Sequence, residues 1–396
     1  MQDALSDGAE SKAPIVCLST QDYDDLWTRK QRFMTDFARL GHRVLYVESQ
    51  WHLFTYLKHL PSGWRRIFRF LRKPREVEPN LFLATPPPLL PFFQVLAPLA
   101  TVNNFIMGLW LRLQASRLQM NNPLAYTYVP YSHLAIKLLG SKKVLYEKVD
   151  DYAAAKGLVR KATVDKLERR LLNIAQVVVV TASRLKTMMQ GRHDNVYLIP
   201  NGCETQHFQK VAEIRTPAEV IASLPQPRIG FVGALAYWCD LGLIEYLARN
   251  RPQWHFVFIG PKLTDARQLE AFANVHLIGR VPYSLLPTYM AGIDVFINPY
   301  KQDDIAESCS PLKVFEYLAA GKPVVSVPMP EVTRFAPQVR IAGDYPQFLL
   351  CIEELLQMTM TERDELSRDL QALVHGDTWT NRFNRTRQVM AEEFGF

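Results

Sequence analysis

A lysine and a glutamate stand three residues apart in a segment that is otherwise mostly apolar. Residues 303–330 read DDIAESCSPLKVFEYLAAGKPVVSVPMP, and Lys313 precedes Glu316 on a predicted short helix that ends at Gly321. An ammonium group can bind a phosphate, and a carboxylate one turn further along can accept hydrogen bonds from two ribose hydroxyls. This pairing suits a nucleotide diphosphate. Alternatively, Lys313 is a solvated helix lysine and Glu316 is its i,i+3 partner.

The start of the same helix adds donors for an anion. Ser310 and Pro311 suit a helix entry, because serine caps N-termini and proline fits the first turn. The backbone N–H groups near Ser310 and Leu312, together with the positive end of the helix dipole, are therefore expected to face a bound anion. With Lys313 they could stabilise a departing diphosphate without a metal.

Composition places the chain among globular proteins of two domains. It has 396 residues, of which 48% are hydrophobic and 21% charged. Its five scattered cysteines form no CxxC pair, which disfavours a disulfide framework or a zinc site. The segment MQDALSDGAESKAP lacks the apolar core of a signal peptide, and no uncharged apolar run reaches the roughly 18–20 residues of a membrane span. We expect a cytoplasmic protein.

Segment 51–75 is rich in aromatic and basic residues and contains no Asp or Glu. Helical spacing places Trp64 and Phe68 on one face and the arginines on the other, which is typical of a helix lying on an anionic membrane. The alternatives are a helix packed on its own domain and a nucleic-acid surface, although no recognised nucleic-acid motif accompanies it. The residues expected to face the membrane are Trp64, Arg65, Arg66, Phe68, Arg69 and Arg72.

Short β-rich runs alternate with helical stretches along the whole chain, the pattern of parallel sheets built from βαβ units. No GxGxxG or GxxxxGK[ST] follows a strand, which disfavours a nicotinamide or P-loop protein. The predicted strands are 15–19, 43–48, 81–84, 124–129, 144–149, 177–181, 197–199, 229–232, 255–259, 275–278, 295–298 and 324–327.

The segment SPLKVFEYLAAGKPVVS resembles the nucleotide-sugar helix of GT-B glycosyltransferases of the glycosyltransferase 4 group. Four further pieces resemble the same group in the same order: VVVVTASRLKTMM, NVYLIPNGCETQHF, IGFVGALAYWCDLGLIEYLA and NVHLIGRVPYSLLPTYMAGIDVFINPY. The resemblance implies an α/β fold of the GT-B type, with two Rossmann-like doubly wound parallel-sheet domains facing a cleft. It also implies a nucleoside diphosphate sugar as co-substrate, with no cofactor and no metal.

On this resemblance the chain divides into four parts. Residues 1–205 form an acceptor-binding domain, 206–227 a linker and 228–377 a donor-binding domain, while 378–396 form a helix that crosses back to the first domain. The resemblance assigns the donor to the helix residues already named and to Gly233, Arg280 and Val281. Gly233 lets a loop backbone approach the phosphates, although a plain tight turn is the alternative.

The chain also departs from the group. Ser308 stands where retaining members carry the first of two glutamates, and residues 234–240 contain no Arg or Lys. These departures resemble the branch of teichuronic-acid-type transferases and the xanthan glucuronosyltransferase, so the stereochemical outcome is left open. An inverting transfer needs a general base.

The acceptor side is expected in the first half of the chain. LYEKVDDYAAA ends a predicted strand with Asp150 and Asp151, and either carboxylate could act as the base. Helix capping is the alternative for both. Asp22, Asp25 and His133 also follow strands and could contact the acceptor, with capping or purely structural roles as alternatives.

The resemblance thus implies a transferase that moves a sugar from a nucleoside diphosphate sugar, with UDP as the expected nucleotide, onto a lipid-linked or polysaccharide acceptor. We expect it at the inner face of the plasma membrane. Two alternatives remain open at this point. One is a sugar-nucleotide epimerase of GT-B-like fold, which would form product without an acceptor. The other is an inactive scaffold in a polysaccharide assembly complex, which would bind nucleotide without transfer.

Overall fold

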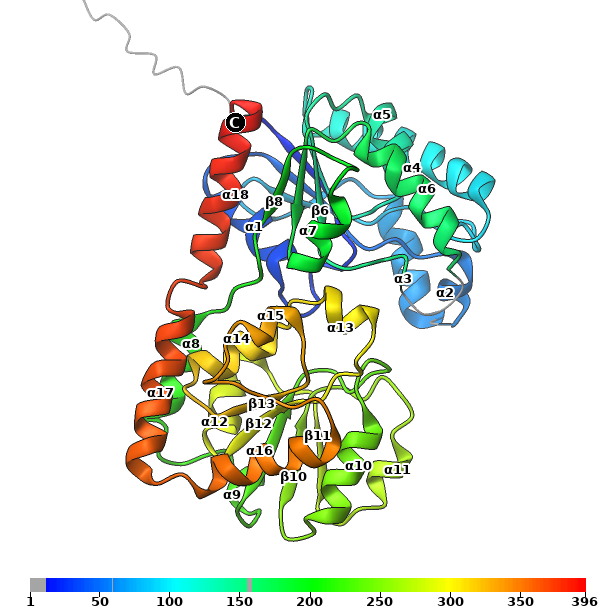
Figure 1. Ribbon diagram of the computed structural model, residues 1–396. Coiled ribbons are helices and arrows are strands. Elements are labelled where there is room, and N and C mark those ends of the chain that lie inside the picture. Colours follow the sequence, from blue (N-terminus) through cyan, green and yellow to red (C-terminus); the bar gives the residue numbers. More distant parts are fainter. Residues whose placement is uncertain (1–11, 59, 155–158) are drawn as a thin grey trace, which may run out of the picture. The chain divides into compact units, whose positions relative to one another are not determined.

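The structure, a computed structural model, describes residues 12–58, 60–154 and 159–396. The chain forms two compact units, each built around its own sheet (Figure 1). The first unit consists of Met1–Val180, Leu185–Ile199 and Phe383–Phe396, and the second of Thr181–Arg184 and Pro200–Arg382.

The first unit contains an eight-stranded sheet in the order β3-β4-β2-β1-β5-β6-β7-β8. All neighbouring strands are parallel except β3 and β4. Most strands are apolar and buried at every position, as expected for strands covered on both faces. The strands are β1 (Ile15–Leu18), β2 (Val44–Val47), β3 (Arg75–Glu78), β4 (Leu81–Ala84), β5 (Leu124–Thr127), β6 (Val144–Lys148), β7 (Val177–Val180) and β8 (Val196–Leu198).

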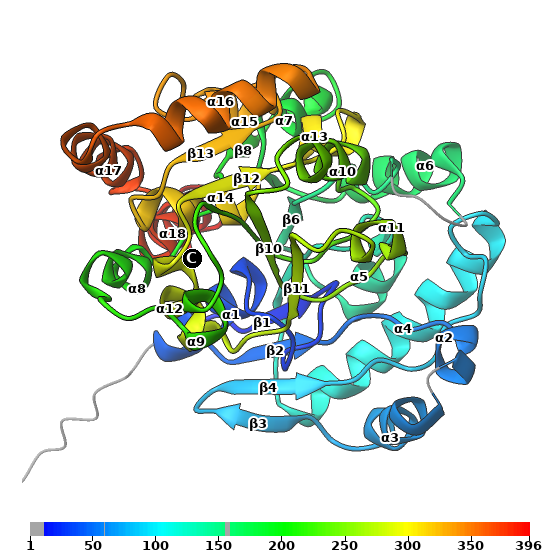
Figure 2. The ribbon, with the colours of Figure 1, turned by 90° about the horizontal axis from the view of Figure 1, so that it is seen from below.

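Helices cover both faces of this sheet. Figures 1 and 2 show α1 and α18 on one side and α4, α5 and α6 on the other. Phe37 of α1 packs on Phe383 of α18, with ring centroids 4.8 Å apart. The helices are α1 (Arg29–Arg39), α2 (Leu53–Lys58), α3 (Leu60–Phe70), α4 (Ala97–Arg117), α5 (His133–Leu139), α6 (Lys161–Leu172), α7 (Ser183–Met189) and α18 (Trp379–Phe394).

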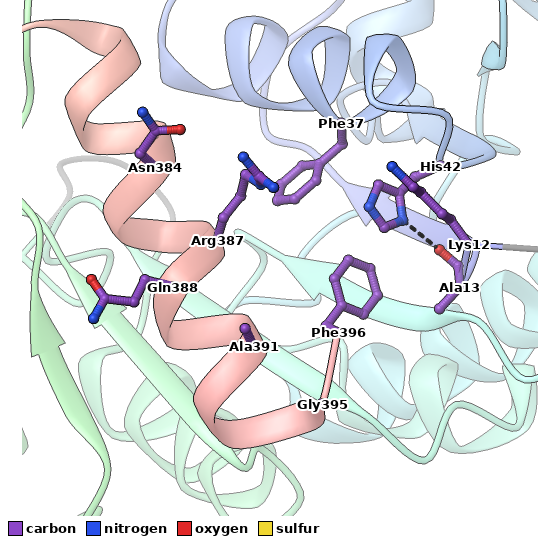
Figure 3. Close-up of a pocket in the computed structure, with 10 residues that line it drawn as sticks. All are labelled: Lys12, Ala13, Phe37, His42, Asn384, Arg387, Gln388, Ala391, Gly395 and Phe396. Atoms are coloured by element: carbon purple, nitrogen blue, oxygen red, sulfur yellow. Dashed lines mark hydrogen bonds between the residues drawn. The ribbon is translucent and has the colours of Figure 1, made fainter. Parts of the chain in front are cut away.

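The last turns of α18 line a cavity of about 740 Å³ beside α1 (Figure 3). On one wall the rings of His42 and Phe396 stack with centroids 4.6 Å apart, and Nδ1 of His42 lies 2.9 Å from the carbonyl oxygen of Ala13. None of the residues predicted from sequence to form a site lines this cavity.

The second unit contains a six-stranded parallel sheet in the order β11-β10-β9-β12-β13-β14. From β9 the chain first runs outward through β10 and β11 and then returns to β12 on the other side. The ends of β9 and β12 therefore form the switch point at which open α/β sheets bind ligands. The strands are β9 (Arg228–Val232), β10 (His255–Ile259), β11 (Val275–Gly279), β12 (Val295–Asn298), β13 (Val324–Ser326) and β14 (Arg340–Ile341).

Helices and two short 3₁₀ turns surround this second sheet (Figure 2). They are α8 (Thr205–Gln209), η1 (Lys210–Glu213), α9 (Glu219–Ala222), α10 (Leu241–Asn250), α11 (Arg267–Glu270), η2 (Tyr283–Leu285), α12 (Leu286–Ala291), α13 (Asp304–Ser308), α14 (Leu312–Ala319), α15 (Pro330–Thr333), α16 (Tyr345–Gln357) and α17 (Met360–Val374).

Every predicted strand forms, and β3 and β14 are additional. The predicted C-terminal helix forms as α18, and from Phe383 onward its residues belong to the first unit. The predicted linker 206–227 is corrected. It folds as α8, η1 and α9, and it belongs to the second unit because Phe208, Val211 and Ile221 are buried in that unit's core.

Candidate functional site

Two glycines allow unusually close backbone packing at the switch point of the second sheet. Gly233 follows β9 with φ of +135°, and Gly260 follows β10 with φ of +146°. The N–H of Gly233 donates to the carbonyl of Ile259 at 2.8 Å. A Cβ on Gly260 would overlap the carbonyl oxygen of Gly233, so glycine is required there. The two loops are therefore held against each other.

Lys313 reaches this glycine loop from the first turn of α14. Its Nζ donates to the Tyr300 hydroxyl at 2.9 Å and lies 5.0 Å from the centroid of the Phe231 ring. A Cβ on Gly233 would come within 2.9 Å of Lys313 Cε. Burial lowers the pKa of Lys313, and the charge of Glu316 partly offsets that effect. The result is a partly desolvated cation without a carboxylate salt bridge among the described residues, which suits a ligand anion.

The start of α14 carries a second group suited to an anion. Ser310 is only 4% exposed, and among the described residues its hydroxyl has no hydrogen-bond partner. Its carbonyl is held by the Asn201 side chain at 2.8 Å. A buried hydroxyl without a partner costs free energy, so a ligand oxygen at this helix start would relieve that cost.

Glu316 lies one turn after Lys313, as the helical spacing predicted. The neighbouring Tyr317 fixes this turn, since its buried hydroxyl accepts a hydrogen bond from the N–H of Val232 at 2.7 Å. The turn that carries Glu316 is therefore tied to the end of β9. The structure thus brings Gly233, Lys313 and Glu316 into one neighbourhood.

The position that would carry the first glutamate of retaining relatives has no acid. Ser308 ends α13, where its buried hydroxyl donates to the carbonyl of Asp304 at 2.7 Å. The adjacent Glu307 is exposed, and its Oε2 lies 3.6 Å from Nε of Arg184. No carboxylate therefore takes the place of Ser308.

Arg280 and Val281 follow β11, the edge strand of the second sheet, with Arg280 exposed and Val281 partly buried. The end of β11 is joined to the glycine loops, because the N–H of Gly260 donates to the carbonyl of Gly279 at 2.8 Å. The contact of Arg280 and Val281 with the base stays a prediction. Leu312, the first residue of α14, is partly buried.

Sequence reasoning missed Tyr300, Phe231 and Gly260. Tyr300 follows β12 and holds the ammonium of Lys313, while Phe231 presents its ring to the same group. The only available signal was their position at strand ends, because the contacts they make depend on the order of the strands in the sheet.

In the first unit Asp150 and Asp151 follow β6, as predicted, but their surroundings differ. Asp151 Oδ1 accepts from the N–H of Ala153 at 3.2 Å and lies 4.0 Å from Nζ of Lys148. The N–H of Ala153 belongs to a turn, because residues 152 and 153 form a turn and the next helix that the structure describes, α6, begins at Lys161, so the helix-capping alternative is wrong for Asp151. Asp150 is exposed to solvent.

A buried lysine that sequence reasoning did not single out lies near Asp150. Lys30 of α1 donates to Oε1 of Gln21 at 3.2 Å, and its Nζ is 5.4 Å from the centroid of the Tyr128 ring. Burial lowers the pKa of Lys30, while the charges of Asp150 and Glu147 raise it. These groups gather where β1, β5 and β6 end, at the switch point of the first sheet.

Asp22 has a structural role that the sequence did not indicate. One oxygen accepts hydrogen bonds from the backbone and hydroxyl of Ser49, at 3.0 and 2.5 Å, and the other lies 2.5 Å from Nη1 of Arg66. The predicted outward position of Arg66 is therefore wrong. Its side chain is 5% exposed, because it is drawn inward to Asp22 and covers the Trp51 ring at 4.7 Å.

The other two predicted acceptor residues lie at the same sheet edge as Asp22. Asp25 is exposed, and its N–H donates to the carbonyl of Asp22 at 3.3 Å. His133 begins α5, and burial together with the charges of Arg170 and Lys137 lowers its pKa to about 4. His133 is therefore neutral at pH 7.

The remaining predicted membrane-facing residues lie on α3 or just after it. Phe68, Arg69 and Arg72 are exposed, whereas the side chains of Trp64 and Arg65 lie outside the part that the structure describes. Within the described residues, no helix is both long and apolar enough to cross a membrane, and no cluster of His, Cys, Asp and Glu could hold a metal ion.

Comparison with known proteins supports the resemblance inferred from the sequence. Residues 226–357 match the family described as "Glycosyl transferases group 1". A "Putative teichuronic acid biosynthesis glycosyltransferase TuaH" of Bacillus subtilis (strain 168) is 31% identical over 214 residues, covering 50% of this chain and 52% of that protein. The chain thus spans about half the length of this curated relative.

Solved structures show the same fold over nearly the whole chain. A sucrose-phosphate synthase from Thermosynechococcus elongatus superposes with a TM-score of 0.73 at 14% identity, covering 97% of this chain and 100% of that one. An E. coli structure titled "Trehalose-6-phosphate from E. coli bound with UDP-2-fluoro glucose" gives 0.71 at 12% identity, covering 95% and 98%. The protein therefore has the GT-B fold that the sequence predicted.

Proposed function

We propose that the protein transfers a sugar from a nucleoside diphosphate sugar, with UDP as the nucleotide, to a lipid-linked or polysaccharide acceptor of the cell surface. The observation that carries the proposal is the start of α14, where Lys313 lies against the glycine loop and the buried Ser310 hydroxyl has no partner among the described residues. A diphosphate would satisfy both groups. The match of residues 226–357 and the UDP-sugar bound in the E. coli structure support this donor class.

In the proposed reaction, the acceptor hydroxyl attacks the anomeric carbon and the bond to the diphosphate breaks. Lys313 and the N–H groups at the start of α14 stabilise the negative charge on the departing diphosphate, without a metal. Asp150 accepts the proton of the attacking hydroxyl, as an inverting transfer requires. The absence of an acid at Ser308 supports this assignment, because a retaining relative would carry a glutamate there. The sugar is proposed to be a hexose or a glucuronic acid.

Donor binding can be tested directly by thermal shift. UDP-sugars should raise the melting temperature, with saturating ligand adding about 2.7 kcal/mol to the stability at a hundredfold excess over Kd. UMP lacks the second phosphate and should stabilise much less, and the UDP response should shrink in Lys313→Met. If UMP and UDP stabilised equally, or if no nucleotide stabilised the protein, the proposed donor site would be wrong.

The acid missing at Ser308 favours one alternative, a scaffold that binds nucleotide but transfers nothing. Incubation with a radiolabelled UDP-sugar and membrane lipid extract separates the two functions. Label in the lipid or polymer fraction supports the transferase. Saturable UDP binding without label in any acceptor fraction, across the donors that bind, supports the scaffold. We place the protein at the inner face of the plasma membrane, where lipid-linked acceptors are made.

A further inference from the structure

Helix α4 buries three amide side chains while it exposes a row of large apolar ones, which is unusual for a surface helix. Its buried residues include Asn103, Asn104 and Gln114. Its exposed residues include five large apolar side chains, each 41 to 50% exposed. They are Val102, Phe105, Ile106, Leu109 and Leu113. Their spacing of three or four residues places them in a single stripe along the helix.

Each buried amide of α4 makes at least one hydrogen bond within the protein, although Oδ1 of Asn104 has none among the described residues. Asn103 donates to the carbonyl of Leu90 at 3.0 Å and accepts from its N–H at 2.8 Å. Gly108 lies against α5 so closely that a Cβ would come within 2.6 Å of Leu138 Cβ. The side of α4 that packs on α5 and the loop at Leu90 is therefore fixed, and its apolar stripe faces outward.

More exposed apolar side chains adjoin this stripe. Phe54 of α2 and Phe92, in the loop before α4, make a ring contact with centroids 5.6 Å apart, and both are exposed. Nε1 of Trp110 lies 3.5 Å from the carbonyl of Phe70 and so joins α4 to α3. The end of α3 adds Phe68, 58% exposed. Figures 1 and 2 show α2 beside α3.

The charges around these helices are almost all positive. Residues 49–146 contain only two acids, Glu76 and Glu78, and none lies in α2, α3 or α4. Lys58, Arg69, Arg72, Lys73 and Arg112 are exposed there. A second copy of the chain would bring the same positive charges against these, which disfavours self-association through this surface. An anionic bilayer would neutralise them.

We propose that this surface, formed by α2, α3 and α4 with the Phe92 loop, docks on an anionic phospholipid bilayer. The apolar stripe of α4 inserts among the acyl chains, and the flanking lysines and arginines contact lipid phosphates. The surface differs from the one predicted from segment 51–75 alone, because its main apolar element is α4.

The surface is also connected to the acceptor side of the first unit. Arg66 of α3 reaches inward to Asp22, which follows β1, and Asp22 in turn holds Ser49 after β2. Docking on this surface would place the switch point of the first sheet next to the bilayer. The link to a lipid-linked acceptor in that bilayer rests on the proposed function.

Vesicle flotation of the full chain tests the docking. The protein should float with vesicles that contain phosphatidylglycerol and much less with phosphatidylcholine alone. Phe105→Ser with Leu109→Ser should lower the bound fraction about tenfold or more. Replacing Leu263 and Leu350, exposed residues of the second unit, by serine is the matched control and should leave binding unchanged. Arg72→Glu with Lys73→Glu should weaken binding to the anionic vesicles.

Other results would overturn the proposal. Flotation of the Phe105/Leu109 variant equal to that of the wild type would do so, as would failure of the wild type to float. A dimer in solution that the same variant dissociates would make the surface an interface between copies. UDP thermal shifts are measured in parallel. If the protein floats but no nucleotide raises its melting temperature, the docking stands and the proposed function is rejected. If UDP raises the melting temperature but the protein does not float, the proposed function stands and the docking is rejected.

Discussion

A side chain on Gly233 would collide with Lys313, because its Cβ would lie 2.9 Å from Cε of that lysine. The glycine loop after β9 and the first turn of α14 are thus packed to the limit that glycine allows. Any ligand held by Lys313 must lie close to the backbone of this loop. Three of the predictions below follow from this arrangement.

Gly233→Ala should weaken UDP binding about tenfold, since the new methyl group displaces the Lys313 side chain and the φ of +135° is strained for alanine. Isothermal calorimetry measures the change. Gly140→Ala is the control, because φ there is +85° with nothing within 4 Å of the added Cβ. The control should lower thermal stability but leave UDP affinity unchanged. A UDP affinity of Gly233→Ala equal to that of the wild type would mean that the loop at Gly233 does not contact the ligand.

Lys313→Met should raise the Kd for UDP by about 10- to 100-fold, the usual cost of losing one charge-assisted hydrogen bond. Methionine keeps an unbranched side chain beside the Phe231 ring but removes the charge that lies over it. Lys262→Met removes an exposed lysine that pairs with Glu270 and should have no effect on the Kd. An unchanged Kd in Lys313→Met would refute the role of Lys313 in donor binding.

The pH dependence of UDP binding should also report on Lys313. Because burial lowers the pKa of Lys313 below its ordinary value of 10.5, the ammonium loses its proton, and with it the attraction for phosphate, at a lower pH than an exposed lysine would. Affinity should therefore fall as the pH rises through this lowered pKa. Calorimetric titrations from pH 7 to 10 should show the fall in the wild type and a flatter profile in Lys313→Met. Parallel profiles in the two proteins would assign the effect to another group.

Much of the fold was predictable, because parallel strands buried on both faces leave continuous apolar runs such as Val177–Val180. The site was predictable only in part. Lys313 and Glu316 share one helix, so local spacing reveals their pairing, whereas the contact of Lys313 with Tyr300 depends on the order of strands in the sheet.

The first unit shows why pattern alone can mislead. Arg66 belongs to a basic run that indicates an exposed face, yet the partly buried carboxylate of Asp22 and the buried one of Glu48 draw it inward. Helix α4 has no charged residue before Arg112, so its sequence does not say which side faces water. Both outcomes are set by partners that are distant in the sequence.

His133 should make the protein less stable in mild acid. Its pKa is lowered to about 4, chiefly by burial, whereas in the unfolded chain it is near the ordinary 6.5. Between these values the unfolded state binds more protons, so stability falls as the pH drops from 6.5 toward 4. His133→Gln should show a smaller loss of urea stability between pH 7 and 5. A loss of stability equal to that of the wild type would mean that His133 does not cause the change of the unfolding free energy with pH.

Glu316→Gln should weaken binding, because it replaces a charged carboxylate that can accept from both ribose hydroxyls by an amide with a single accepting oxygen. The wild type is expected to prefer UDP over 2′-deoxy-UDP, and this preference should shrink in the variant. Glu270→Gln, which changes an exposed carboxylate paired with Lys262, is the matched control. If Glu316→Gln lowered both affinities by the same factor, the carboxylate would act on the helix rather than on the ribose.

Asp150→Asn should lower kcat by about 10²- to 10⁴-fold, the range for loss of a general base, while the Kd for the UDP-sugar stays the same. The asparagine keeps the size of the side chain but cannot take the proton of the acceptor hydroxyl. Asp151→Asn is the neighbouring control, since Asp151 already accepts from the N–H of Ala153. This control variant should lower the melting temperature and leave kcat nearly unchanged.

Single-turnover transfer and calorimetry on the same preparations separate these effects. Weakened donor binding in Asp150→Asn would mean that Asp150 acts on the donor. A large loss of kcat in Asp151→Asn alone would move the base to that residue. The assignment to Asp150 rests on its exposure at the end of β6, next to a buried lysine whose pKa its charge raises, while the carboxylate of Asp151 is engaged by the backbone. A carboxylate that reaches solvent can meet an incoming hydroxyl, whereas one held by its own turn must first give up a hydrogen bond.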